Sequence, residues 1–410
     1  MRKKIVCLTV TGLLAAGQAW GSGFRITEQS INSVGMAGGY IANARGPDAS
    51  YFNPANMAWN KDRWQIETSL NYINIPGFDY VDYRDQTLNG SSEKKEFLLP
   101  LVHITSKDIN NFRFGFSLTR PFGLSKKWDE PFPAQWARKF SLEAYEGNPS
   151  MAYRVNDSLS LAVGVRLIYA KGEMKNRIAD DSVLTVRDME GDTTEWGYNL
   201  ALSYQPREAW NISATYRSRV DLDLEGDADL SASSATGIID SYDGDGEVEI
   251  VTPAVLTLST SYTLKKATVT LTWDRTLWSD YEQLDFDYDR AFSDNPYFSS
   301  FDAPANKNWE NTDAFRLAFS YKNTDRLTTM MGIALDETPV PEENLNFELP
   351  GSDTVLYSIG FRYQTSDNME IGFAYLYNDR EDRKVDNNRI NGKFDQRGAH
   401  TVNTALIYTF

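Results

Sequence analysis

From Arg63 to the last residue, the chain repeatedly alternates apolar and polar side chains with a period of two. Residues 159–169 show it clearly, with the apolar set Leu159, Leu161, Val163, Val165, Leu167 and Tyr169. This alternation is typical of β-strands whose two faces meet different surroundings. Many of the apolar sets begin or end with Trp or Tyr, as lipid-facing strands do at the headgroup level. The pattern predicts an all-β fold, a transmembrane barrel, and the alternative is a soluble sandwich whose apolar face forms the core.

The connections between the predicted strands alternate between short turns and long polar loops. The short turns are predicted at residues 106–111, 156–158, 205–209, 264–266, 323–325 and 365–368. The long loops are predicted at residues 74–94, 121–139, 172–191, 222–246, 278–308, 336–353 and 378–397. Bacterial barrels have short periplasmic turns, longer external loops and an even number of antiparallel strands. We therefore expect residues 61–410 to form a transmembrane antiparallel β-barrel of about 14 strands.

The residues before the first predicted strand lack this period and divide into two segments. Residues 1–21 have a basic head, a short apolar stretch and the small-x-small site Ala19-Trp20-Gly21, which together indicate a cleaved signal peptide. Residues 22–60 are rich in Gly, Ala, Asn and Ser and are longer than a strand needs. A barrel of this size leaves a lumen that is filled or becomes a water channel. We expect residues 22–60 to form a hatch, or plug, in the lumen; the alternative is a disordered periplasmic tail.

Composition narrows the class of function. The formal net charge of −16 disfavours binding to nucleic acid. Cys7 is the one cysteine and lies in the predicted signal peptide, so we expect no disulfide and no thiolate metal site. His103 and His400 come without a Gly-x-Ser-x-Gly elbow or a paired-histidine zinc motif, so we expect neither an enzyme nor a bound metal or cofactor. The acidic stretches 221–225 and 240–249 are expected to be solvated loops, which divalent ions could bridge to lipopolysaccharide.

Short motifs stand in a set order along the mature chain. They are Gly23-Phe24-Arg25-Ile26-Thr27-Glu28, Asn53-Pro54-Ala55, Pro121-Phe122-Gly123-Leu124, and the stretches 331–341 and 348–353. In this order, behind a signal peptide and within a barrel pattern, they resemble the FadL and toluene-catabolism family of outer-membrane channels for hydrophobic compounds. The resemblance covers nearly the whole mature chain and implies a barrel with an N-terminal hatch in a Gram-negative outer membrane. Phe410 resembles the terminal aromatic residue read by the barrel-insertion machinery of such bacteria.

The resemblance also implies a route for the substrate. Hydrophobic molecules would be caught at an external groove, pass to a pocket beside the hatch and leave sideways where the third strand is kinked. The motif Pro121-Phe122-Gly123 matches this lateral opening. Pro and Gly are also expected to interrupt the hydrogen bonding of the strand there. The alternative is that the motif is only the outer end of the strand and the start of the loop. Phe24 matches the family's plug phenylalanine and would close the pocket. Asn53-Pro54-Ala55 would fix the turn of the hatch against the opening.

Aromatic and basic residues are the remaining candidate contacts with substrate. The aromatic set behind the third strand is Trp128, Phe132, Trp136 and Phe140. The last three are spaced by four and would share one face of a short helix, so we expect an exposed capture groove, or else a loop that packs on itself. A fatty acid also needs a cation for its carboxylate. Arg177 roughly matches a family arginine, whereas Arg217 and Arg316 lie on the polar faces of their strands, where pairing with a lumen acid is the alternative.

Together these features predict passive outer-membrane transport of hydrophobic compounds, with long-chain fatty acids as the first substrate class. Aromatic or aliphatic hydrocarbons are the alternative within the same family, and a general water-filled porin is the alternative from another class. The long loops could also serve as an adhesin or a phage receptor. The expected partners are outer-membrane lipid and lipopolysaccharide, the hydrophobic substrate and the barrel-insertion machinery, and the protein is expected to be a monomer.

Overall fold

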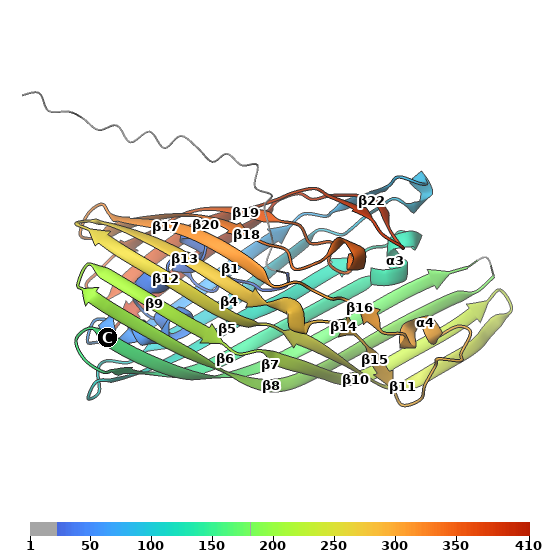
Figure 1. Cartoon of the computed structure of the whole chain (residues 1–410), viewed down its shortest axis with the longest axis horizontal. Coiled ribbons are helices and arrows are strands. Elements are labelled where there is room, and N and C mark those ends of the chain that lie inside the picture. The colour runs from blue at the N-terminus through green and yellow to red at the C-terminus, as the bar shows by residue number, and fades with distance from the viewer. Residues whose placement is uncertain (1–22, 181) are drawn as a thin grey trace, which may run out of the picture.

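The computed structural model describes residues 23–180 and 182–410, so the predicted signal peptide and Ser22 lie outside the described residues. Within this part of the chain, 14 antiparallel strands form a closed barrel (Figure 1). In order around the wall they are β1 (Gln65–Ile75), β4 (Lys95–Thr105), β5 (Phe112–Lys127), β6 (Lys139–Arg154), β7 (Leu159–Ala179), β8 (Leu184–Arg207), β9 (Trp210–Arg217), β12 (Ala254–Leu264), β13 (Ala267–Leu277), β17 (Thr312–Lys322), β18 (Leu327–Asp336), β19 (Thr354–Gln364), β20 (Met369–Arg380) and β23 (Ala399–Thr409). The predicted fold class is confirmed.

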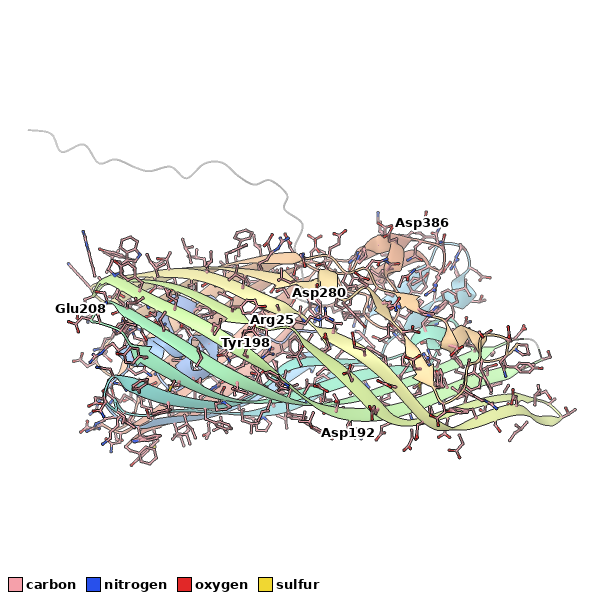
Figure 2. The ribbon with its side chains drawn as sticks, turned by 60° about the horizontal axis from the view of Figure 1, so that its bottom comes forward. Arg25, Asp192, Tyr198, Glu208, Asp280 and Asp386 are labelled. Carbon is pink, nitrogen blue, oxygen red and sulfur yellow. The ribbon has the colours of Figure 1, made fainter. Side chains whose placement is uncertain are left out.

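The barrel closes by pairing its first strand with its last. Gln65 of β1 lies opposite Thr409 of β23, and Asn74 lies opposite His400. Each of the six predicted short turns joins two neighbouring barrel strands. Figure 2 places Glu208, in one of these turns, and Asp386, in a long connection, at opposite ends of the molecule. Because the sheet closes on itself, the wall has no free edge strand.

Side chains alternate between the outer and inner faces of the wall, as the sequence predicts. On β7, Leu161 and Val163 are exposed on the outer face, whereas Ser160 and Ala162 are buried on the inner face. The outer face is therefore apolar, and the inner face carries small, polar and charged side chains. This is the arrangement of a barrel that has lipid outside and polar groups inside.

Two predicted loops are wrong, because residues 172–179 and 184–191, and most of residues 222–246, lie in paired strands. Strands β7 and β8 remain paired as far as Ala179 and Leu184. The strands β10 (Val220–Ser234) and β11 (Gly237–Thr252) form a long hairpin beside them. These residues are polar because the strands extend beyond the lipid-facing part of the wall. There one face of each strand is polar and solvated, and the other is apolar and buried in the core.

Smaller elements cover the end of the barrel opposite the short turns. One sheet of four strands contains β2 (Asp79–Asp82), β3 (Gly90–Ser91), β21 (Arg383–Asp386) and β22 (Asn391–Asp395). The other elements are β14 (Gln283–Leu284), β15 (Phe286–Tyr288), β16 (Ala305–Asn306), α3 (Pro131–Ala137), α4 (Ser299–Asp302), η3 (Gln86–Leu88), η4 (Trp278–Asp280) and η5 (Glu342–Asn344). No helix among the described residues is long and apolar enough to cross a membrane.

Residues 23–60 lie inside the barrel (Figure 1). They contain α1 (Ile31–Gly35), η1 (Ile41–Asn43), α2 (Ala49–Phe52) and η2 (Pro54–Trp59). The helix α1 contacts β18, β19, β20 and β23, η1 contacts β9, β12 and β13, and α2 and η2 contact β4 to β8. Since these contacts reach strands around the wall and most residues of the segment are buried, the segment packs against the inner face of the barrel.

Buried charges connect this segment to the wall. Arg316 of β17 donates from Nε to Asp274 at 3.0 Å and from Nη2 to Asp336 at 2.7 Å. Its Nη1 donates to the carbonyl of Ala37 at 3.1 Å. On another side of the lumen, Glu146 accepts hydrogen bonds from Arg166 and Arg217. Removing one partner of such a buried pair typically costs about 3–5 kcal/mol, because it leaves an uncompensated charge.

We predict that a mature chain lacking residues 24–60 forms an open pore. The inner face is polar and wide enough for water once the segment is absent. The variant should conduct ions in planar lipid bilayers and let small sugars swell liposomes, whereas the intact protein should do neither. A matched control removes residues 232–239 from the tip of the β10–β11 hairpin, outside the lumen. Equal conductance of the intact protein and the 24–60 deletion would contradict this prediction.

Candidate functional site

The wall has a window between β4 and β5. Residues Gly115–Leu118 of β5 pair with Val102–Thr105 of β4, and the pairing ends there. Farther out, the residues of β4 from Lys95 to Leu101 pair with β1 but, within the described chain, not with β5. At the outer end, the Glu93 N–H donates to the Lys127 carbonyl at 2.9 Å and brings the two sides together again.

The inner rim of this window is an irregularity in β5. The register between β5 and β6 shifts between Thr119 and Phe122, so Arg120 and Pro121 have no opposite residue on β6. Pro121 cannot donate to a strand partner, because it has no N–H. On the other side of the window, Pro100 of β4 likewise suits a strand that is locally an edge. The interruption in pairing coincides with the motif Pro121-Phe122-Gly123.

The N-terminal segment supplies hydrogen-bond partners to this irregular part of β5. The Ile26 N–H donates to the Pro121 carbonyl at 2.8 Å, and the Gly123 N–H donates to the Phe24 carbonyl at 3.0 Å. Gln29 is buried, and its side-chain amide donates to the Arg120 carbonyl at 2.8 Å and accepts from the Arg120 N–H at 2.9 Å. The backbone N–H and carbonyl groups that β5 leaves unpaired in the wall therefore form hydrogen bonds with the N-terminal segment.

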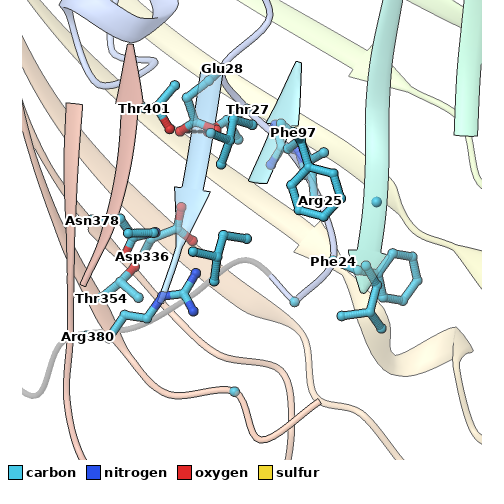
Figure 3. Close-up of a pocket in the computed structure, with 18 of the residues that line it drawn as sticks. Phe24, Arg25, Thr27, Glu28, Phe97, Asp336, Thr354, Asn378, Arg380 and Thr401 are labelled. Carbon is cyan, nitrogen blue, oxygen red and sulfur yellow. Dashed lines mark hydrogen bonds between the residues drawn. The ribbon is translucent and has the colours of Figure 1, made fainter. Parts of the chain in front are cut away.

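A cavity of about 190 Å³ lies between residues 23–28 and the wall. Its apolar lining includes Ile73, Phe78, Phe97, Leu99, Leu124, Leu356 and Leu376. Figure 3 shows Asn378, Thr354 and Arg380 on one side of this cavity and Phe97 and Phe24 on the other. Gly123 also lines it, so the cavity lies directly behind the window in the wall.

Two cations line this cavity without an anionic partner. Lys126 is 5% exposed, and its Nζ lies 3.1 Å from the centre of the Phe78 ring. Arg380 is half-buried, and its guanidinium carbon lies 5.3 Å from the same ring. Neither side chain forms an ion pair or a hydrogen bond within residues 23–180 and 182–410. The aromatic face offsets part of the cost of burying these charges, and an anion would offset more.

Phe24 separates this cavity from a smaller one near the outer loops. It is 4% exposed and its ring centre lies 4.8 Å from that of Trp278 and 5.6 Å from that of Trp309. Phe24, Leu124 and Leu349 line both cavities. Burial raises the pKa of Tyr281, another neighbour of Phe24, and the nearby Glu348 carboxylate, which pairs with Lys307, raises it further.

The motif Asn53-Pro54-Ala55 does not lie at the window. The Asn53 side chain donates to the Ile41 carbonyl at 3.2 Å, and Pro54 begins η2. Ala55 packs in a buried cluster with Met57, which contacts β5 near Gly115, toward the short-turn end. These residues shape the interior of the segment, and the contact with the kink is made by residues 24–29.

The expected exposed aromatic stripe is also absent. Trp128 is fully buried and donates from its indole N–H to the Phe347 carbonyl at 2.9 Å. Phe132 and Trp136 lie on α3 with ring centres 5.0 Å apart, and Trp136 stacks on Phe347. Phe140 is buried in β6, beyond the end of the helix, and lines the smaller cavity. The expected stripe is corrected to a loop that packs on itself, because Phe347 and the neighbouring small sheet cover these rings.

None of the three candidate arginines is free in the main cavity. Arg177 is exposed on the outer part of β7 and does not line the cavity. Arg217 is paired with Glu146, and Arg316 with Asp274 and Asp336, as the alternative interpretation expected. These pairings occupy the guanidinium groups of Arg217 and Arg316, and among the described residues that line the main cavity the cations without an ion pair are instead Lys126 and Arg380.

Sequence reasoning missed Lys126, Arg380 and Gln29. Strand parity offers a signal for two of them. Phe122, Leu124 and Lys126 alternate along β5, and Leu376, Asn378 and Arg380 alternate along β20, so each cation shares the inner face of its strand. For Gln29 we find no comparable local signal, because its neighbours come from distant strands.

A closed barrel with an outward-facing apolar surface and an internal cavity defines an outer-membrane channel protein. The chain belongs to the family described as outer membrane protein transport protein (OMPP1/FadL/TodX), whose model matches residues 12–409. This confirms the resemblance and the outer-membrane location. It is a family of outer-membrane transporters of hydrophobic substrates rather than of enzymes.

Individual relatives extend over almost the whole chain. Outer membrane protein P1 of Haemophilus influenzae is 28% identical over 457 residues, which cover 98% of this chain and 95% of that protein. The long-chain fatty acid transport protein of Escherichia coli O6:H1 is 24% identical over 415 residues, 90% of each chain. The crystal structure of a Pseudomonas aeruginosa FadL homologue shares the fold, with a TM-score of 0.80 and 18% identity over 95% of this chain and 100% of that one.

We predict that Gln29→Ala loosens the N-terminal segment at the window. The substitution leaves the buried Arg120 N–H and carbonyl without partners, at a cost of about 1–3 kcal/mol. Hydrogen–deuterium exchange should become faster at residues 24–29 and 120–123 and remain unchanged elsewhere in the barrel. Gln86→Ala, on the outer element η3, is the matched control. Unchanged exchange at residues 24–29 would show that the amide does not hold the segment.

Proposed function

We propose that this protein transports long-chain fatty acids passively across the outer membrane. The observation that carries this proposal is the pair of unpartnered cations, Lys126 and Arg380, in an otherwise largely apolar cavity. A carboxylate placed beside Phe78 would accept charge-assisted hydrogen bonds from both side chains. The acyl chain would then lie against the apolar residues that line the cavity, out of water.

The lumen contents favour this function over that of a general porin. Residues 23–60 would act as a hatch that blocks the passage of water and hydrophilic solutes, since they contact strands around the wall. Phe24 would act as its gating residue, because it divides the main cavity from the smaller cavity below the outer loops. A hydrophobic molecule entering from outside would have to displace this ring to reach Lys126.

The window between β4 and β5 suits a lateral exit. Gly123 lines the cavity and belongs to the part of β5 that β4 does not pair. A fatty acid that leaves here would pass its acyl chain directly into the lipid, whereas a route along the lumen would expose the chain to water. An uncharged hydrocarbon could use the same window, but it would leave Lys126 and Arg380 without an anion.

We predict that Lys126→Gln and Arg380→Gln each weaken oleate binding by about tenfold to a hundredfold, the loss expected for one hydrogen bond to a charged group. Equilibrium titration of the detergent-solubilised full-length protein with oleate measures this change. Binding of methyl oleate should stay the same, since the ester carries no charge.

Lys127→Gln is the matched control, because Lys127 neighbours Lys126 but pairs with Glu93 outside the cavity. Oleate affinity that is unchanged in both cavity variants would contradict the fatty-acid assignment. Wild-type protein that binds toluene and methyl oleate as tightly as oleate would favour hydrocarbons as the substrate.

We predict that Gly123→Trp blocks uptake of oleate by intact cells and leaves insertion of the barrel unchanged. A Cβ at this position would already lie 3.0 Å from the Ile26 side chain, so the indole must fill the window or displace the segment. Gly147→Trp is the matched control, because a Cβ there meets only Phe116 at 4.0 Å. Normal uptake by Gly123→Trp would argue against an exit at this point.

A further inference from the structure

Arg120 crosses the wall at the window. It lies in the irregular part of β5, and its side chain is 9% exposed and lines the main cavity. Its backbone groups are held by Gln29, so its position does not depend on its own side chain. The guanidinium lies 5.9 Å from the ring centre of Phe97 on β4 and 5.2 Å from that of Tyr145 on β6.

The two ends of this guanidinium meet different surroundings. Its Nη2 lies 3.3 Å from the Glu143 carboxylate, whose side chain is 45% exposed. Glu143 and Tyr145 are two residues apart on β6 and share its outer face, where Tyr145 is exposed. The Nε of Arg120 is buried, lacks a hydrogen-bond partner among the described residues and lies 3.7 Å from the Cβ position of Gly123, at the cavity.

This arrangement presents one charged group to both sides of the window. The unpartnered Nε–H is a donor available to an anion in the cavity, and the ion pair with Glu143 lies at the surface, where it is weak. An incoming carboxylate would meet the same planar donor group that Glu143 already occupies. The aromatic rings of Phe97 and Tyr145 flank the guanidinium and keep it oriented across the opening.

We propose that Arg120 is the carboxylate-binding residue of the exit. The carboxylate of a departing fatty acid replaces Glu143 as the partner of the Arg120 guanidinium and passes through the window in contact with it. This inference rests on the proposed function and adds a step after binding at Lys126 and Arg380. Glu143 is then the competitor that returns Arg120 to its resting position once the fatty acid has left. Arg120 favours this exit over any route on which the carboxylate of the substrate would have no cationic partner.

The test separates release from binding in the full-length protein. Uptake of labelled oleate and of methyl oleate is measured in intact Gram-negative cells that lack their own channel and express the wild type, Arg120→Gln, Arg120→Lys or Glu143→Gln. Oleate affinity is measured on the same purified proteins. Outer-membrane fractions are immunoblotted so that rates refer to equal amounts of inserted barrel.

Arg120→Gln should lower oleate uptake by about tenfold, the effect of one charged hydrogen bond, while oleate affinity falls by less than uptake does and methyl oleate uptake stays unchanged. Arg120→Lys should restore most of the uptake, because it restores the charge, and Glu143→Gln should keep it at or above the wild-type rate. Equal losses of oleate and methyl oleate uptake in Arg120→Gln would show a structural role and overturn the proposal, as would uptake equal to wild type. Wild-type cells that take up no oleate would instead refute the proposed function itself.

Discussion

The hydrogen bonds between residues 24–29 and the irregular part of β5 are the constraint on which the rest of the site depends. A wall surrounded by lipid has no water to satisfy a strand that leaves its neighbour. Here the carbonyl of Pro121, the N–H of Gly123 and both backbone groups of Arg120 find partners on the N-terminal segment. The same contacts place Phe24 at the cavity and keep the window between β4 and β5 in the wall. The segment and the window are thus one structural unit.

The charged residues of the interior fall into two groups: those in ion pairs within the barrel, and those that line the main cavity without such a pair among the described residues. Arg316, Arg217 and Arg166 form ion pairs with Asp or Glu, and Arg316 and Arg217 also donate to the Ala37 and Tyr51 carbonyls of the N-terminal segment. Lys126 and Arg380 lie against the ring of Phe78 and form no ion pair with the described residues. A charge without a partner is costly to bury, and an anionic ligand of the proposed class would supply the missing partner. Under the proposed function, transport and stability would therefore depend on different cations.

Much of the wall could be predicted from sequence, but less of the site. The period of two identified the strands and their outer faces, and the polar turns marked where the strands reverse. Polarity alone misplaced residues 172–191 and 222–246, because a strand above the membrane and a loop both expose polar side chains. The aromatic residues 128–140 were expected to face solvent, yet Phe347 and the small sheet that includes Phe394 cover them. Composition cannot show which distant segment covers a surface.

The sequence by itself determined the barrel, the positions of its short turns and the point where β5 is interrupted. These features follow from period, turn chemistry and the missing N–H of proline, all of which act between near neighbours in the chain. Only the tertiary structure decided which cations are paired, where Phe24 inserts and which residues of the N-terminal segment meet the kink. Those outcomes depend on strands far apart in sequence that closure of the barrel brings around one lumen, and no local pattern records that proximity.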